Sequence, residues 1–362
     1  MLLALLSVAT AQQEAAVELS RSVPLVSAEG VGMGSAGLAW ASGAKGMFAH
    51  PAAPAMRPVE SRAHVTGTVT ANISTFSQLT GIGAQDFGLP KDAWQGGIAN
   101  FGGTLLVNNG GGGVVLSTAR YSSGDREIRS KETHYLGAWS WTDGNVVFGV
   151  GYRTATARLS TPTLDVTYRG RRGFETGVVL CAGGWNLALL WRSRIEASPR
   201  IAGDDIPSIA VLPAEFSVGG SWVGLDPVTG LPARLAIDLV ALGAVEGGVS
   251  VEGLAMGLDV AKGQEITMSP RVGGELEILP DRLKIRTGSW YEPARSALVP
   301  GRLHGTAGFE VKLFSVPWIA GRELPLSVDW AVDGARGYRN VAWVGFGTWR
   351  SGRTGPWIGP RE

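Results

Sequence analysis

Most of the chain alternates apolar with small or polar residues. From about Val59 onward it breaks into stretches of roughly 10 to 14 residues, separated by Gly, Pro, Asp and Asn, and helical spacing is almost absent. In the stretch NVVFGVGYRTATAR every second residue is apolar: Val146, Phe148, Val150 and Tyr152. A period of two residues is that of a β-strand with two unlike faces. The pattern therefore predicts an all-β protein.

Three features favour a membrane barrel over a soluble sandwich, which alternates in the same way. The stretches are long enough to cross a bilayer, for which about 9 to 11 tilted residues suffice. Gly recurs inside them, as in Gly96-Gly97 and Gly102-Gly103, and permits curvature and close approach of whatever fills a lumen. Aromatic residues near the strand ends are typical of the belts at headgroup level: Trp94, Tyr135, Trp139, Trp141, Trp191, Trp222, Trp290, Tyr291, Trp330, Trp343 and Trp349.

About fifteen stretches qualify as strands, and because single-chain bacterial barrels use even strand numbers we expect about 14, with one of the fifteen wrong. The candidate strands are 61–76, 94–107, 112–122, 131–142, 145–158, 173–182, 185–197, 215–224, 233–244, 248–260, 271–279, 282–292, 303–315, 322–333 and 339–350. The predicted fold is an outer-membrane antiparallel β-barrel of residues 59–350, followed by a C-terminal tail of residues 351–362.

The N-terminus indicates export. MLLALLSVATAQQ is a short apolar run that ends in Ala9-Thr10-Ala11, the small-x-small pattern that precedes a signal-peptidase cut, so residues 1–11 are predicted to be a signal peptide. The alternative is a buried N-terminal segment, since the run is short and lacks basic residues. No other apolar run reaches about 18 residues, the length of a spanning helix. An exported chain of this kind is periplasmic, secreted or an outer-membrane barrel.

Composition excludes several other functions. Charged residues make up 17% of the chain, which is few for a soluble protein, and the net charge of +1 argues against a nucleic-acid partner. The single cysteine, Cys181, has apolar neighbours and cannot form an internal disulfide. His64, His134 and His304 lack metal-ligand spacing, and no Gly-x-Ser-x-Gly nucleophile motif is present. We therefore expect no enzyme activity, no metal and no cofactor.

The stretch from Gly30 to Pro58 contains Gly32-x-Gly34-x-x-Gly37, but neither a strand before it nor a helix after it supports a dinucleotide-binding loop. It resembles instead the N-terminal segment of the FadL family of outer-membrane transporters, in which a Gly-Met-Gly-x-Ala-Gly run precedes Asn-Pro-Ala. This chain has Gly32-Met33-Gly34-Ser35-Ala36-Gly37 and then His50-Pro51-Ala52, with His50 in place of the Asn. The stretches 212–222, 231–240 and 283–296 also resemble that family.

The resemblance implies a barrel of 14 strands whose lumen holds an N-terminal hatch, residues 12–58. It also implies passive uptake of long-chain fatty acids or other hydrophobic small molecules, with release sideways into the membrane. Candidate ligand contacts in the hatch are Met33, Trp40, Met47, Phe48, His50, Pro51 and Ala52, which in the alternative interpretation only pack the hatch against the wall.

A row of cations is the second candidate ligand site. Arg282, Lys284 and Arg286 share the lumen-facing parity of one strand and are predicted to hold a carboxylate. In the alternative interpretation these residues pair with acidic lumen residues such as Asp238 or Glu310.

Three functions of different classes remain open. The first is the transporter, with outer-membrane lipid and the barrel assembly machinery as further partners, and a monomeric state. The second is a non-transporting barrel that serves as a scaffold or accessory in protein export or surface attachment. The third is a soluble secreted β-rich binding protein or enzyme.

Overall fold

The computed structural model describes residues 16–19, 26–40, 42–56, 65–78, 94–162, 164–200, 207–250, 253, 259–297, 300–317, 323–335 and 338–349. The predicted signal peptide 1–11, the boundary between residues 58 and 59, His64 and the predicted tail 351–362 lie outside these residues.

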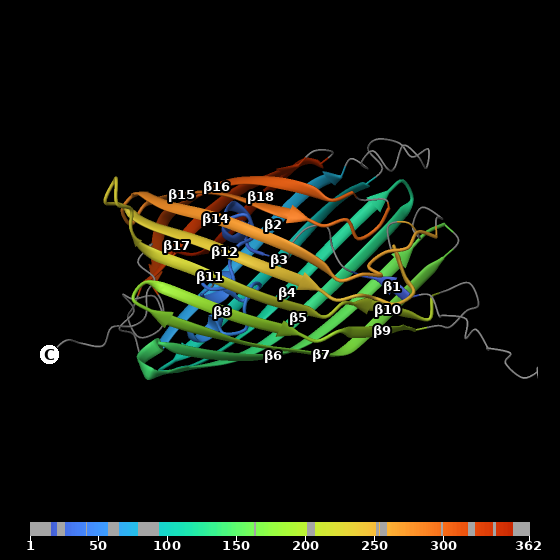
Figure 1. Cartoon of the computed structure of the whole chain (residues 1–362), viewed down its shortest axis with the longest axis horizontal. Coiled ribbons are helices and arrows are strands. Elements are labelled where there is room, and N and C mark those ends of the chain that lie inside the picture. The colour runs from blue at the N-terminus through green and yellow to red at the C-terminus, as the bar shows by residue number, and fades with distance from the viewer. Residues whose placement is uncertain are drawn as a thin grey trace, which may run out of the picture.

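Fourteen strands form the closed wall of an antiparallel barrel. They are β2 (Val65–Gln78), β3 (Trp94–Val107), β4 (Gly110–Ser123), β5 (Arg126–Trp141), β6 (Val146–Ser160), β7 (Asp165–Ala182), β8 (Trp185–Arg192), β11 (Glu215–Leu225), β12 (Pro232–Leu242), β14 (Thr267–Leu279), β15 (Leu283–Glu292), β16 (Arg302–Pro317), β17 (Glu323–Ala335) and β18 (Tyr338–Thr348). The last strand, β18, pairs with the first, β2, so the wall has no free edge (Figure 1).

Along each strand of the wall, side chains point in turn to the outside of the barrel and into its lumen, as the alternation in the sequence predicts. Strand β8 shows this most simply, because its residues are exposed and buried in strict turn. Leu187 and Trp191 point outward, whereas Asn186 and Arg192 point into the lumen. Large apolar side chains cover the outside of the wall, as expected for a surface that faces lipid. The predicted outer-membrane type of barrel is therefore confirmed.

Aromatic side chains line up across the outer face. Tyr135 on β5 lies opposite Tyr152 on β6, whose ring centroid is 5.7 Å from that of Phe174 on β7. Trp191 and Phe216 continue this row on β8 and β11. We call these five residues the outer aromatic row. A second set of exposed aromatic side chains lies closer to the turns that join β5 to β6 and β7 to β8: Trp139, Trp141, Phe148 and Trp185.

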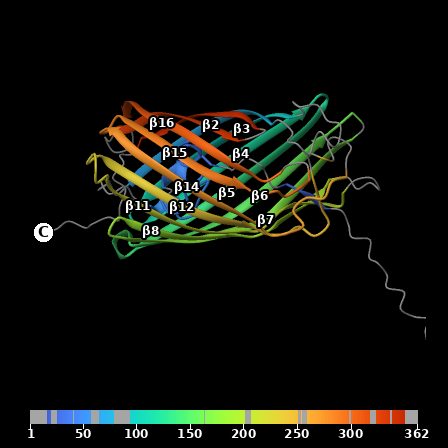
Figure 2. The same ribbon diagram turned by 45° about the horizontal axis from the view of Figure 1, so that its top comes forward.

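The two ends of the barrel differ (Figure 2). At one end, here called the short-turn end, adjacent strands are joined by tight turns such as Asn108-Asn109 between β3 and β4. At the other, the capped end, two longer connections carry β9 (Ile195–Pro199), β10 (Ile209–Leu212) and β13 (Gly248–Ser250). The N-terminal strand β1 (Ala16–Glu18) pairs in parallel with both β10 and β13, which completes a small sheet.

Residues 26–56 lie within the barrel, and we call them the inner segment (Figure 1). They contain α1 (Ala28–Gly32), α2 (Gly43–Gly46) and the 3-10 turn η1 (Ala53–Ala55). The Ser27 hydroxyl caps α1 by accepting from the Gly30 N–H at 3.3 Å. Gly34 and Gly43 adopt φ values of 63° and 58°, so each can turn the chain sharply. Nearly all described residues of the segment are buried.

None of the described helices has the length and apolar character needed to cross a membrane.

One predicted strand is wrong as part of the wall. Within the stretch 248–260 the described residues form only the short strand β13, which pairs with β1 in the small sheet. Strands β12 and β14 pair directly with each other and leave no edge for an intervening strand. The predicted stretch 185–197 is divided between β8 and β9. The small sheet was not predicted.

Glycines of the wall lie where the inner segment touches it. A Cβ atom added to Gly149 on β6 would overlap the backbone of Pro51 and Ala52, and one on Gly273 on β14 would overlap the backbone of Met33. An added Cβ would meet the backbone of Pro54 at Gly111, the backbone of Met33 and Gly34 at Gly288, and the His50 side chain at Gly177. The wall and the inner segment therefore approach each other to backbone distance on several sides of the lumen.

We expect Gly149→Ala to destabilise the barrel by about 1 to 3 kcal/mol, because the added methyl group overpacks this contact. The control is Gly137→Ala on the neighbouring strand β5, where an added Cβ would meet no atom within 4 Å. The measurement is the temperature at which the folded band disappears from a semi-native gel. Equal temperatures for the two variants would contradict the described contact.

Candidate functional site

Side chains of the wall satisfy the backbone of the inner segment. The Gly37 and Leu38 N–H groups donate to the Asp238 carboxylate at 2.7 and 2.9 Å. The Ala44 N–H donates to the Thr68 hydroxyl at 2.7 Å, and the Arg192 guanidinium donates to the Phe48 carbonyl at 2.9 Å. Asn72, Asn100, Arg271 and Thr306 make further bonds of this kind. An irregular segment is thereby buried with its polar groups paired.

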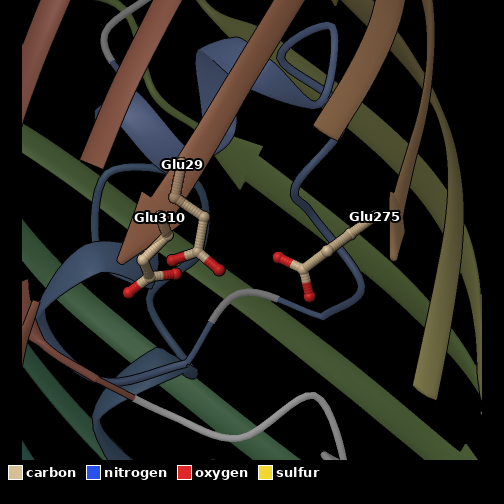
Figure 3. Close-up of side chains that lie close together, drawn as sticks. All are labelled: Glu29, Glu275 and Glu310. Carbon is tan, nitrogen blue, oxygen red and sulfur yellow. The ribbon is translucent and has the colours of Figure 1, made fainter. Parts of the chain in front are cut away.

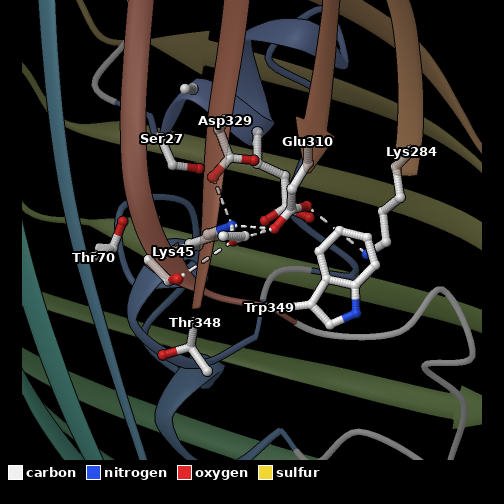
Figure 4. A network of polar contacts seen from close by, with 12 residues as sticks. Ser27, Lys45, Thr70, Lys284, Glu310, Asp329, Thr348 and Trp349 are labelled. Atoms are coloured by element: carbon white, nitrogen blue, oxygen red, sulfur yellow. Dashed lines mark hydrogen bonds and ion pairs between the residues drawn. The ribbon is translucent and has the colours of Figure 1, made fainter. Parts of the chain in front are cut away.

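A buried group of ion pairs joins the inner segment to the wall (Figure 4). The Lys45 ammonium lies 2.6 Å from both the Glu310 and the Asp329 carboxylates. Arg286 on β15 contacts Asp329 at 2.9 Å and also pairs with Glu310. Burial alone would lower the pKa of Lys45, but Asp329 and Glu310 raise it above its ordinary value. Lys45 is therefore charged at any physiological pH.

Three carboxylates of this region come within 4.8 Å of one another: Glu29, Glu275 and Glu310 (Figure 3). Such a group can in principle hold a metal ion, but each member already faces a cation. Glu275 lies 2.7 Å from Arg286, and Glu29 lies 3.6 Å from the same side chain. The donor set is therefore occupied by protein cations, and we interpret it as a structural ion-pair network.

His50 is fixed in one protonation state by its two partners. Its Nδ1 accepts from the Ala52 N–H at 3.0 Å, so its Nε2 carries the proton and donates to the Leu189 carbonyl at 3.1 Å. Burial lowers the pKa of His50 to about 4. A proton on Nδ1 would remove the bond to Ala52, so the neutral ring is the form that fits.

A cavity of about 180 Å³ lies between the inner segment and the small sheet. Leu38 and Phe48 of the inner segment, Leu212 of β10 and Trp290 of β15 contribute apolar surface. Arg295 also lines the cavity and donates to Glu18 of β1 at 2.8 Å. The lining of the cavity is therefore more apolar than polar, and it comes from the wall, the inner segment and the capped end.

Arginine side chains give the cavity its positive groups. Arg153, Arg192 and Arg271 line it from β6, β8 and β14. Arg192 is engaged by Glu175 and Glu215. Arg153 pairs with Glu132 at 3.3 Å, and Arg271 donates to the Ser35 carbonyl at 3.2 Å. The remaining nitrogens Nε and Nη1 of Arg153 and Nε of Arg271 are buried and have no hydrogen-bond partner within the described part of the chain. Buried guanidinium groups with unused donors are costly, so an acceptor in the cavity would be stabilising.

The predicted hatch residues divide between the cavity and the wall. Phe48 lines the large cavity, and Trp40 lines a second, smaller one. Met33, Met47 and His50, with the adjacent Pro51 and Ala52, are buried against wall glycines and line neither cavity. Their contact with a ligand stays a prediction.

The predicted cation row is only partly in the lumen. Lys284 and Arg286 are buried there and pair with acidic residues, Glu310 among them, as the alternative interpretation expects. Arg282 is exposed instead, because β15 begins at Leu283 and Arg282 belongs to the preceding turn. Asp238 pairs with backbone amides of the inner segment rather than with this row.

Sequence reasoning missed the arginines of the cavity. Arg153 falls on the face opposite the apolar residues Val146, Phe148, Val150 and Tyr152, so the alternation alone could have indicated that it points into the lumen. The alternation could not predict that Arg153 lies near Arg192 and Arg271, because it gives the face on which a residue lies but not the register between distant strands.

Comparisons with solved structures match the whole barrel. A Pseudomonas aeruginosa FadL homologue aligns over 90% of this chain and 97% of its own, with a TM-score of 0.53 and 13% identity. The Pseudomonas putida toluene transporter TodX aligns over 90% and 98%, with a TM-score of 0.53 and 11% identity. The monoaromatic hydrocarbon channel CymD aligns over 89% and 96%, with a TM-score of 0.57 and 11% identity.

The chain has the FadL-type barrel fold. No protein-family model matches the sequence, and the comparison with curated proteins gave no match. At 10–13% identity the FadL-type likeness establishes the fold alone. The predicted resemblance is confirmed at that level.

We expect Lys45→Met to destabilise the FadL-type barrel by about 3 to 5 kcal/mol, because Glu310 and Asp329 would lose a buried partner. The triple variant Lys45→Met/Glu310→Gln/Asp329→Asn removes the uncompensated charges and should recover part of the loss. Lys131→Met, an exposed lysine on β5, is the control. The measurement is unfolding in urea, followed by tryptophan fluorescence. A Lys45→Met midpoint equal to that of the control would argue against the network.

His50 predicts a pH dependence. Its pKa in the folded protein, about 4, lies below the ordinary 6.5, so the unfolded chain binds more protons between these values. The contribution of His50 to the free energy of unfolding should therefore be largest above pH 6.5. It should decrease as the pH falls toward 4, by up to about 3 kcal/mol. Unfolding in urea at several pH values, compared with His50→Gln, isolates the contribution. Parallel pH profiles for the two proteins would contradict it.

Proposed function

We propose that this protein is an outer-membrane channel for passive uptake of hydrophobic small molecules, with long-chain fatty acids as the leading substrate class. Its closed wall, apolar outer face and FadL-type fold support a transporter of hydrophobic compounds. Two structural neighbours are described as a toluene transporter and a monoaromatic hydrocarbon channel. The short-turn end would face the periplasm and the capped end the exterior, as is usual for outer-membrane barrels.

The observation that carries the proposal is the composition of the large cavity. Leu38, Phe48 and Trp290 offer apolar contact, worth about 0.8 kcal/mol for each buried methylene. Arg153 and Arg271 offer guanidinium N–H groups that have no partner in the described part of the chain. An amphipathic acid, with an apolar chain and one carboxylate, matches both properties.

The inner segment would act as the hatch, as part of the predicted residues 12–58. It lies between the large cavity and the short-turn end, so a ligand cannot pass straight through while it stays in place. Lateral release into the bilayer past this hatch would avoid exposing an apolar chain to water, at about 0.8 kcal/mol per methylene. Movement of the hatch and lateral release are both part of the proposal.

Uptake by proteoliposomes tests the proposal. Arg271→Gln removes a charged donor, so we expect roughly tenfold weaker uptake of oleate, which corresponds to about 1.5 kcal/mol. Uptake of a neutral hydrocarbon should change little. The control is Arg282→Gln, which removes an exposed arginine outside the lumen. Absence of oleate and hydrocarbon uptake by the folded wild-type protein would overturn the transporter.

A non-transporting scaffold is the second candidate function, and the ion pairs of Lys45 favour it. A hatch held by buried charges and by backbone contact with wall glycines is costly to displace. Mass spectrometry of solvent extracts from the purified barrel separates the two functions. A stoichiometric apolar acid supports the transporter, whereas an empty barrel that also fails in uptake supports the scaffold.

A further inference from the structure

Basic side chains gather on the outer face of β4 to β7, toward the capped end. We call them the basic patch: Arg120, Arg129, Lys131, Arg158, Arg169 and Arg172. All six are exposed, and they alternate with buried lumen-facing neighbours such as Ser130 and Ala157. The patch is therefore on the outside of the wall and separate from the cavity.

Three of these arginines form a row across adjacent strands. Arg120 lies directly opposite Arg129, and Arg129 lies directly opposite Arg158. Like charges in directly opposite positions destabilise a sheet. Two carboxylates offset part of this charge, since Glu127 pairs with Arg120 and Arg129, and Asp165 pairs with Arg158 at 2.6 Å. This row therefore has three guanidinium groups and two carboxylates, and its net charge is positive.

The next row has cations without acids. Lys131 lies opposite Thr118 and Thr156, and Thr156 lies opposite Arg169. Among the described residues neither Lys131 nor Arg169 has an ion-pair partner. The neighbouring threonine hydroxyls can form hydrogen bonds, but they carry no negative charge that would neutralise Lys131 and Arg169. The patch as a whole therefore carries excess positive charge.

The position of the patch relates it to the membrane. Tyr135 and Tyr152 of the outer aromatic row lie on the same strands as Lys131 and Arg158, further from the capped end. Lys131 is four residues from Tyr135, which at about 3.3 Å per residue of a tilted strand is roughly 10 Å of height. Aromatic belts lie at the interface, so the patch lies at or just beyond headgroup level.

We propose that the basic patch binds the phosphate groups of an anionic lipid in the outer leaflet. A guanidinium group can donate two parallel hydrogen bonds to the oxygens of one phosphate, and the Lys131 ammonium adds a compact positive charge to the patch. The acyl chains of the same lipid would lie along the apolar wall below, against the outer aromatic row. This site goes beyond the transport proposal and rests on the placement of the barrel in the outer membrane with the capped end facing the exterior.

The test uses the full-length protein in phosphatidylcholine nanodiscs that contain bisphosphorylated lipid A, or its dephosphorylated counterpart. Native mass spectrometry counts the lipid that stays bound. The wild-type protein should retain the phosphorylated lipid preferentially. The variant Lys131→Gln/Arg169→Gln should retain it about fivefold less for each lost cation. The control Arg282→Gln/Lys312→Gln removes two cations at the short-turn end and should retain it as the wild type does.

Each other outcome overturns the site. Equal retention of the two lipids would mean that phosphate is not recognised, and equal retention by the patch variant would mean that these residues do not bind it. Displacement of the lipid by millimolar inorganic phosphate alone would indicate a small-anion site rather than a lipid surface. Heat-dependent gel mobility verifies folding of each variant. Oleate uptake by the patch variant should equal that of the wild type, so the two proposals fail separately.

Discussion

Every polar backbone group of an irregular segment must find a partner if that segment is to be buried, and this constraint shapes the interior of the barrel. The inner segment has only two short helices and one 3-10 turn, and internal bonds such as that from the Ala36 N–H to the Met33 carbonyl pair only part of its amides and carbonyls. Wall residues supply further partners, with Asp238 accepting from Gly37 and Leu38 and with Arg192 donating to Phe48. Polar residues on the lumen face of the strands are therefore needed for structure before any ligand is considered.

The same interior leaves space at one place. Where the wall carries glycine, the inner segment approaches to backbone distance, and beside the cavity the arginines Arg192 and Arg271 reach the segment only through their guanidinium groups. The large cavity lies in the second kind of region, beneath the small sheet. Its apolar side chains and unused guanidinium donors line one cavity, which is what an amphipathic ligand requires.

Much of the wall could be predicted because strand alternation is a local property. The stretch 94–107 matches β3 in both bounds, and the even strand number required that one candidate be discarded. The alternation could not identify 248–260 as that candidate, because the strands with which a stretch pairs determine whether it belongs to the wall. It also could not foresee β1, whose parallel pairing with β10 and β13 joins segments far apart in sequence. The cavity depends on such distant pairings, which explains why only Phe48 among the predicted ligand residues lines it.

Hydrogen exchange, followed by mass spectrometry in mild detergent, tests most directly whether the inner segment is held within the wall. We expect peptides covering residues 26–56 to exchange as slowly as peptides of β5 and β6, because their amides are bonded and buried. Peptides of the exposed turn 226–231 provide the fast reference. Exchange of residues 26–56 at the rate of that turn would contradict the account.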